Sequence, residues 1–149
     1  MTFFFDRSLG KGIPRALNQI KKLPVEVIFH QQRFPANAPD DIWLPEVGRQ
    51  GWIVLGQDYR YHTRPNELFA IQQYNVGCFY LWGSNAPQWD TFRCFARAYD
   101  KIADIVVSKQ RPFLYVVHAN GRVVEWDLRA GRVPFGRSRR AALGGFSAP

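Results

Sequence analysis

Three aspartates stand where the sequence predicts the ends of buried strands or the start of a helix. Asp6 ends the apolar run of residues 2–6, TFFFD, and Asp58 follows shortly after the run 52–55, WIVL. Asp40 precedes the helix predicted over residues 41–50. Because the carboxyl ends of parallel strands meet at one edge of an α/β sheet, we expect the three carboxylates to converge there. Carboxylates that lie close together repel, so their convergence requires a cation, and Mg²⁺ favours such oxygen ligands.

Two further acids are weaker candidates for ligands of the same cation. Asp41 adjoins Asp40, and only the directions of the two side chains separate them. Glu67 lies in the first turn of a helix predicted to begin at Pro65, where a negative charge also stabilises the helix start. Asp40 itself has a plainer interpretation as the N-cap of its helix.

Arginines near these acids could bind the phosphates of a polyanionic substrate. Arg7 follows Asp6, and Arg60 and Arg64 follow Asp58 in a stretch that also contains His62 and two tyrosines. Basic groups interleaved with aromatic rings can hold phosphates and stack on unpaired bases. A solvated loop of this composition is equally ordinary, so the nucleic-acid interpretation stays one of two alternatives.

The elements that would position these residues alternate between strands and helices. We predict strands over residues 2–6, 25–29, 52–55 and 76–82, followed by a hairpin of residues 112–118 and 122–128 around Asn120-Gly121. The first helix is predicted after Asp6, with Ile13, Leu17 and Ile20 on one face. The second is predicted over residues 41–50, with Ile42, Leu44 and Val47 buried. Two more are predicted, one that begins at Pro65 and one over residues 87–109. Residues 30–39 are expected to form a loop. This order indicates an α/β domain with a mainly parallel sheet.

Composition sets the limits of this interpretation. The 149 residues, 46% of them hydrophobic, suit one domain over residues 1–128 and an Arg-rich, flexible tail over residues 129–149. The tail holds five arginines and no acid, while the body has 15 cations and 12 acids within a total net charge of +8. The electrostatic field of a positively charged protein attracts phosphates. We expect a soluble cytoplasmic protein that does not enter a membrane, with Cys78 and Cys94 as buried free thiols.

With the three aspartates placed, the sequence resembles the PIN-like nucleases, and within them the VapC-type toxins. The stretches that carry the resemblance are FFFDRSLGKG, PDDIWLPEVGRQGWIVLGQD and RPNEL, and the similarity covers about residues 2–127. Asp6, Asp40 and Asp58 match the acidic positions, and Glu67 matches a position that is often acidic. Relatives tend to have a threonine close before the third acid, where this chain has Gly56-Gln57-Asp58.

The resemblance implies a three-layer α/β/α fold and a ribonuclease that depends on Mg²⁺ or Mn²⁺. Asp6 and Asp58 would bind the metal, and Asp40 would be either a ligand or the base that orients the attacking water. The partners that we expect are RNA as substrate, an antitoxin protein and, as a homodimer, a second copy of the chain.

Two readings from other classes compete with the nuclease. The first is a non-catalytic module that binds nucleic acid or protein on the same fold. The second is a phosphoacceptor domain with Asp58 as its target. The second would require an acid pair after the first strand and a lysine after a late strand, whereas Arg7 follows Asp6 and residues 112–118 contain no lysine.

Overall fold

The computed structural model describes residues 1–57 and 65–129, and the side chains of the second range from Leu68 onward. The strands are β1 (Thr2–Phe5), β2 (Glu26–Phe29), β3 (Ile53–Gly56), β4 (Gly77–Leu81), β5 (Phe113–Val117) and β6 (Val123–Glu125). The helices are the 3₁₀ turn η1 (Arg7–Leu9), α1 (Gly12–Leu17), α2 (His30–Arg33), α3 (Asp40–Gln50), α4 (Pro65–Gln73) and α5 (Gln88–Ser108).

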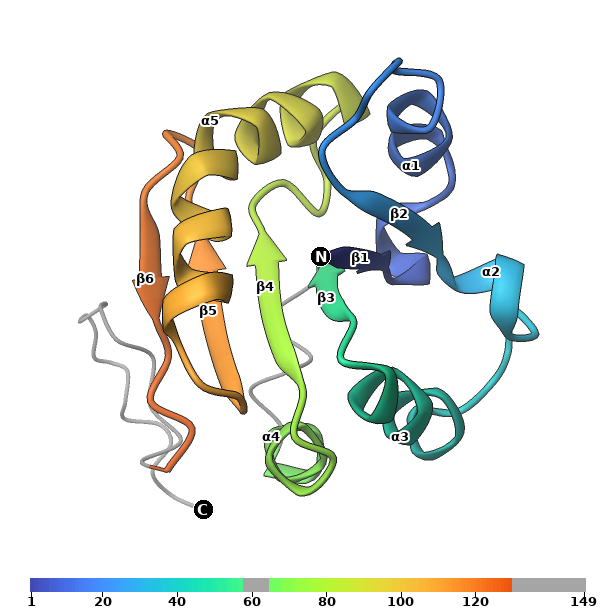
Figure 1. Ribbon diagram of the computed structural model, residues 1–149, viewed down its shortest axis with the longest axis vertical. Helices are drawn as coiled ribbons and strands as arrows, with labels where there is room; N and C mark the ends of the chain where they lie inside the picture. Colours follow the sequence, from blue (N-terminus) through green and yellow to red (C-terminus); the bar gives the residue numbers. More distant parts are fainter. Residues whose placement is uncertain (58–64, 130–149) are drawn as a thin grey trace.

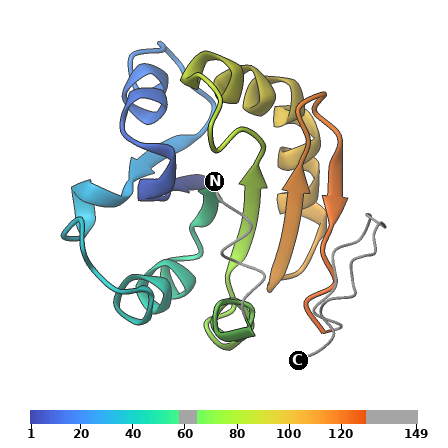
Figure 2. The ribbon, with the colours of Figure 1, turned by 180° about the vertical axis from the view of Figure 1, so that it is seen from behind.

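One sheet of six strands in the order β2-β1-β3-β4-β5-β6 forms the centre of the molecule (Figure 1). All neighbouring pairs are parallel except β5 and β6, whose arrows point in opposite directions in both Figure 1 and Figure 2. The predicted hairpin is therefore confirmed. Its turn contains Gly121 at a φ of +88°, a conformation that glycine adopts without a steric penalty.

The sheet is covered on both faces, which explains why its parallel strands read as continuous apolar runs. Alternate residues of β1 divide between two cores: Phe3 and Phe5 pack on the side of α1 and α5, and Phe4 packs on the side of α3 and α4. Every residue of β3, β4 and β5 is buried. Helix α5 crosses in front of the sheet in Figure 1 and behind it in Figure 2. The fold is the mainly parallel α/β/α arrangement that the sequence predicts.

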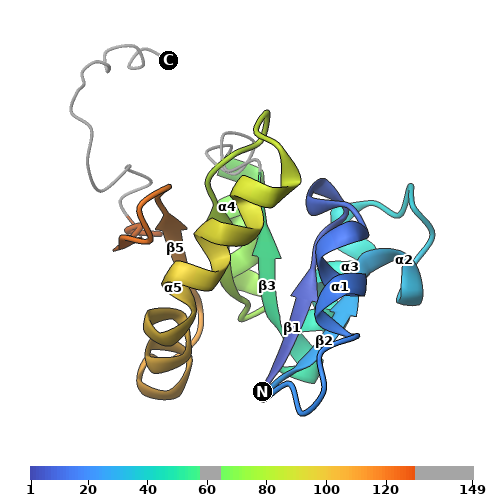
Figure 3. The same cartoon turned by 90° about the horizontal axis from the view of Figure 1, so that it is seen from above.

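The order of the strands in the sheet reverses between β1 and β3. Strand β2 lies on one side of β1, and β3, β4 and β5 follow on the other side. Strands β1, β2 and β3 point the same way in Figure 3. In open α/β sheets, ligands bind beyond the carboxyl ends of the strands at such a switch point. The ends of β1 and β3 are therefore where a site is expected.

Two predictions about the first crossover and the loop after it were wrong in part. Helix α1 ends at Leu17, so Ile20 lies beyond it and is exposed; the chain turns there toward β2, with Lys22 at a φ of +58°. Residues 30–39 are not wholly a loop, because α2 forms one helical turn directly after β2. The side chain of Gln32 supports this turn by accepting a hydrogen bond from the backbone N–H of Phe29.

Helix α3 confirms the predicted burial of Leu44 and Val47 but not that of Ile42. Trp43, Leu44, Val47 and Gly48 face the core, and Ile42 is 57% exposed. At about 100° of rotation per residue, Ile42 lies nearly opposite the centre of that buried stripe. The indole of Trp43, the largest side chain on the helix, packs against β1 instead.

Both cysteines are buried free thiols, as predicted. Across the described ranges, no helix combines the length and the apolar character needed to cross a membrane.

Candidate active site at the switch point

Asp6 lies at the switch point itself. It follows β1 directly, and its backbone N–H donates a hydrogen bond of 2.8 Å to the carbonyl of Leu55 in β3. The contact between the two strands thus continues to Asp6. The side chain of Asp6 is half-buried and caps the turn η1, so its carboxylate stays at the carboxyl edge of the sheet.

Ser8 links Asp6 to the end of β3. Its hydroxyl donates to Oδ2 of Asp6 at 2.9 Å and accepts a hydrogen bond of 3.1 Å from the backbone N–H of Gln57. Gln57 is the residue before Asp58 in the chain. One hydroxyl therefore fixes the orientation of the first acid and the path of the chain that leads to the third. The sequence contained Ser8 within the stretch DRSLG, but its spacing gave no sign of a bridge to residue 57.

Asp40 reaches the same edge from a distant part of the chain. It is the first residue of α3, and Pro39 is the N-cap, so the carboxylate of Asp40 does not cap this helix. Its Oδ1 instead accepts a hydrogen bond of 3.1 Å from the indole Nε1 of Trp43. The indole stacks on Phe4 of β1 at 5.5 Å between ring centroids. Asp40 is thereby held by a side chain that is anchored in the core.

The guanidinium of Arg7 ties the segment before Asp40 to the turn after Asp6. Nη1 of Arg7 donates to the carbonyls of Ala36 and Ala38 at 2.7 and 2.8 Å. These bonds fix the chain that leads into α3. Sequence reasoning assigned Arg7 to substrate phosphates, whereas its observed contacts are with the backbone of this loop.

Asp6 and Asp40 line one small cavity, whose other walls include Trp43, Val54 and Tyr80. Its volume of about 20 Å³ is close to that of one water-sized group. Among the described residues neither carboxylate forms an ion pair, and Asp41 is exposed and does not line the cavity. The other lining residues are mostly apolar, so the two carboxylates are the charged oxygen ligands that the described lining offers to a hard divalent cation.

A complete set of three ligands is not seen in the part of the chain that the structure describes. Within the described side chains, those of residues 1–57 and 68–129, no three His, Cys, Asp or Glu gather closely enough to hold a metal ion. Asp58, Arg60 and Arg64 lie outside the described residues, as does the side chain of Glu67. The structure therefore brings together two of the three predicted acids.

Sequence reasoning missed His30. It follows β2 just as Asp6 follows β1, and the register of the two strands pairs Phe29 with Phe5. Its side chain is fully buried against Phe4, Phe34 and Trp43, and neither ring nitrogen has a hydrogen-bond partner among the described residues. Burial lowers the pKa of His30, although the charge of Asp6 acts in the opposite direction. Burial therefore disfavours the protonated form of this imidazole, although the charges of Asp6 and Asp40 both favour it.

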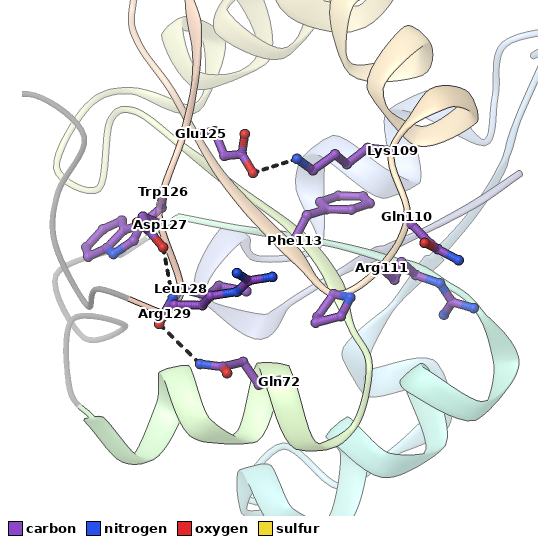
Figure 4. A pocket seen from close by; sticks show the side chains of 11 residues that line it. Gln72, Lys109, Gln110, Arg111, Phe113, Glu125, Trp126, Asp127, Leu128 and Arg129 are labelled. Atoms are coloured by element: carbon purple, nitrogen blue, oxygen red, sulfur yellow. Dashed lines mark hydrogen bonds and ion pairs between the residues drawn. The ribbon is translucent and has the colours of Figure 1, made fainter.

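A larger cavity, of about 650 Å³, lies at the opposite end of the sheet, where β5 begins (Figure 4). Its rim carries the ion pair of Lys109 with Glu125 at 2.8 Å and a hydrogen bond from Gln72 to the carbonyl of Leu128. The described candidate acids, Asp6, Asp40 and Asp41, do not line it. Its position at the amino ends of the strands separates it from the switch point.

Comparison with known families adds one finding. Residues 1–83 match the family described as PIN like domain, a range that includes β1 to β4 and all three predicted aspartates. Comparisons with curated proteins and with solved structures found no match. Because the family match spans more than half of the 149 residues, the chain belongs to the PIN-like domain family.

Proposed function

We propose that this protein is a metal-dependent ribonuclease that hydrolyses phosphodiester bonds of RNA with Mg²⁺ or Mn²⁺. The observation that carries the proposal is the pair Asp6 and Asp40, which share one cavity at the switch point of the sheet and have no countercharge among the described residues. Membership of a family whose members are often nucleases supports the same conclusion.

Each residue of the proposed site has a separate role. Asp6 and Asp40 would hold the cation through carboxylate oxygens, and Asp58, which directly follows Gln57, would complete the ligand set. Ser8 and Trp43 hold the first two carboxylates in place through the hydrogen bonds described above. When bound, a divalent cation lowers the pKa of its water and stabilises charge on the phosphate oxygens. Asp40 would serve either as a ligand of the cation or as the base that accepts the proton of the attacking water.

The test is cleavage of a fluorescently labelled RNA with Mg²⁺, with Mn²⁺ and with a chelator. We expect Asp6→Asn, Asp40→Asn and Asp58→Asn each to lower the rate by more than about 100-fold, beyond the effect typical of groups that only orient a ligand. Asp100→Asn, at an exposed position of α5, is the matched control and should leave the rate unchanged. Asp41→Asn separates the two neighbouring acids and should have little effect.

A different result would favour the binding module instead. In that case RNA affinity would depend on salt but not on Mn²⁺ or on Asp6→Asn, and no variant would alter any cleavage. Thermal melting of each variant shows whether the fold survives the substitution.

We further propose that the protein is the VapC-type toxin of a toxin–antitoxin pair. The stretches around Asp6 and Asp40 support this assignment through their resemblance to that group. Expression of the intact chain should arrest growth, Asp58→Asn should relieve the arrest, and co-expression of the cognate antitoxin should do the same. If the intact chain and the Asp58→Asn variant are equally harmless in the absence of an antitoxin, the toxin assignment fails and the nuclease assignment stands.

A further inference from the structure

A polar cavity of about 310 Å³ lies beside the proposed catalytic edge, on the α5 side of the sheet. Segments distant in sequence form it: the turn after β1, the end of β3, the loop after β4 and the first turn of α5. Its polar lining residues are Arg7, Ser8, Gln57, Ser84, Gln88 and Thr91. Ser8 also bonds the carboxylate of Asp6, so the cavity borders the acids.

The side chain of Gln57 lines this cavity and is held in place by two hydrogen bonds. Its side chain is 9% exposed, and its amide nitrogen donates to the carbonyl of Gly83 and to the hydroxyl of Thr91. Because the Gly83 carbonyl can only accept, the orientation of the amide is determined. The oxygen Oε1 accepts no hydrogen bond from the described residues. A ligand in the cavity could donate a hydrogen bond to this oxygen.

Gln88 supplies a second amide, at the rim. Its side chain is exposed, makes no hydrogen bond within the described part of the chain, and lies over Gly10 and Gly12. A Cβ at Gly12 would collide with Oε1 of Gln88, and one at Gly10 would come within 3.1 Å of Nε2. The two glycines thus leave room for the amide. Both its donor and its acceptor remain available to a ligand.

The chemistry of the lining favours a neutral heterocycle over a phosphate. Among the residues that the structure describes, no carboxylate lines the cavity, and the one lining cation, Arg7, donates to the carbonyls of Ala36 and Ala38. Amides and hydroxyls provide donors and acceptors together, as the edge of a nucleobase requires. The volume is at the lower end of the range for small-ligand sites.

We propose that this cavity holds the base of the nucleotide next to the scissile phosphate, with the amides of Gln57 and Gln88 bonding to its edge. The inference rests on the proposed ribonuclease function, because it takes RNA as the ligand. It assigns to the site a base preference that the acids alone would not give.

The experiment measures binding in the non-cleaving Asp6→Asn protein. Fluorescent tetranucleotide RNAs that differ at one position, including one with an abasic nucleotide there, are titrated by anisotropy. We expect one base to bind at least about 10-fold more tightly than the abasic RNA. Gln88→Ala should remove most of that difference. Gln110→Ala changes another exposed glutamine, at the opposite end of the sheet, and should retain it.

Gln88→Ala is the decisive variant, because the exposed side chain of Gln88 is not needed for folding. Gln57→Leu tests the buried amide of Gln57, once a melting curve shows that this variant folds. Equal binding of all bases and of the abasic RNA would overturn the proposal. So would competition by inorganic phosphate as effective as competition by the preferred RNA.

Failure of this inference can be told apart from failure of the proposed function. Cleavage of RNA without any base preference beside the cut would reject the base site and leave the nuclease intact. Base-selective binding that Gln88→Ala removes, without cleavage in any metal, would support the site and reject the nuclease.

Discussion

The indole nitrogen of Trp43 donates a hydrogen bond of 3.1 Å to the carboxylate of Asp40. Trp43 is in turn stacked on Phe4 of β1, so the bond joins the candidate metal ligand to the core. A ligand held in this way keeps its position while the cation binds.

Trp43→Phe therefore retains an aromatic ring against Phe4 and removes the donor to Asp40. We expect a loss of about 10- to 100-fold in Mn²⁺ affinity or in cleavage rate, the range typical of partners that orient a ligand. Isothermal titration with Mn²⁺ and the RNA cleavage assay measure it. Trp89→Phe, at an exposed tryptophan that stacks on Phe92, is the control. Equal effects of the two substitutions would contradict a specific role for the bond.

Ser8→Ala should separate activity from stability. The hydroxyl bridges Asp6 and the backbone N–H of Gln57, but Ser8 itself is exposed, so unfolding should become easier by only about 1 kcal/mol. Cleavage should fall by about 10-fold or more because the carboxylate loses its fixed orientation. Urea unfolding and cleavage rates measure the two effects. Ser108→Ala, which removes a hydroxyl bond to the backbone of α5, should affect stability alone.

Gly48→Ala should destabilise the protein, although the same change in most helices is favourable by about 1 kcal/mol. A Cβ at Gly48 would overlap the backbone carbonyl of Tyr74, directly after α4, and neither backbone can move freely. We expect a loss of about 1–3 kcal/mol from overpacking. Gln50→Ala changes an exposed position of the same helix and should be nearly neutral. A raised melting temperature for Gly48→Ala would show that α3 and α4 are less closely packed than described.

Stability should fall as the pH drops below about 6.5. Burial lowers the pKa of His30, and burial together with the charge of Arg122 lowers that of His118, so both rings bind protons more weakly in the folded state. Their contribution is full above the unfolded value of 6.5 and is lost as the pH falls toward their folded pKa values.

Melting temperatures between pH 8 and pH 5, recorded with a chelator, test this dependence. His30→Phe keeps a ring against Phe4 and Trp43 and should flatten the pH dependence, while His118→Gln measures the share of the second histidine. If His30→Phe leaves the slope between pH 6.5 and 5 unchanged, the buried imidazole does not titrate as described.

The Arg-rich tail should contribute to RNA affinity through charge alone. Replacing Arg132, Arg137, Arg139 and Arg140 by glutamine removes four of the five arginines of residues 129–149. Each phosphate contact contributes to the salt dependence of binding, so affinity should fall at low salt and the slope of log K against log salt should become shallower. Binding isotherms for single-stranded RNA at several salt concentrations measure both, and unchanged slopes would mean that the tail does not touch RNA.

Much of the scaffold followed from local sequence. The apolar runs around Phe3–Phe5 and Ile53–Leu55 predicted buried strands, because only strands covered on both faces lack polar alternation. Asn120-Gly121 predicted the hairpin from the conformation that such a turn requires. The position of Asp6 at a strand end then placed one acid at the carboxyl edge of the sheet.

Other features depended on contacts between distant segments. The exposure of Ile42 on α3 was not predicted from the apolar spacing, because it depends on how Trp43 fits against Phe4. The burial of His30 results from α2, a single turn that begins where β2 ends. Residue spacing carries no information on such packing, because it depends on the shapes of side chains from several elements.

The sequence by itself determined which residues could carry chemistry at this site, since residue type and position relative to a strand end are local properties. Only the tertiary structure decided that Asp40 shares a cavity with Asp6, that Asp41 does not, and that Ser8 spans from Asp6 to Gln57. The reason is physical: these relationships depend on the order of strands in the sheet and on hydrogen bonds between residues up to 49 positions apart.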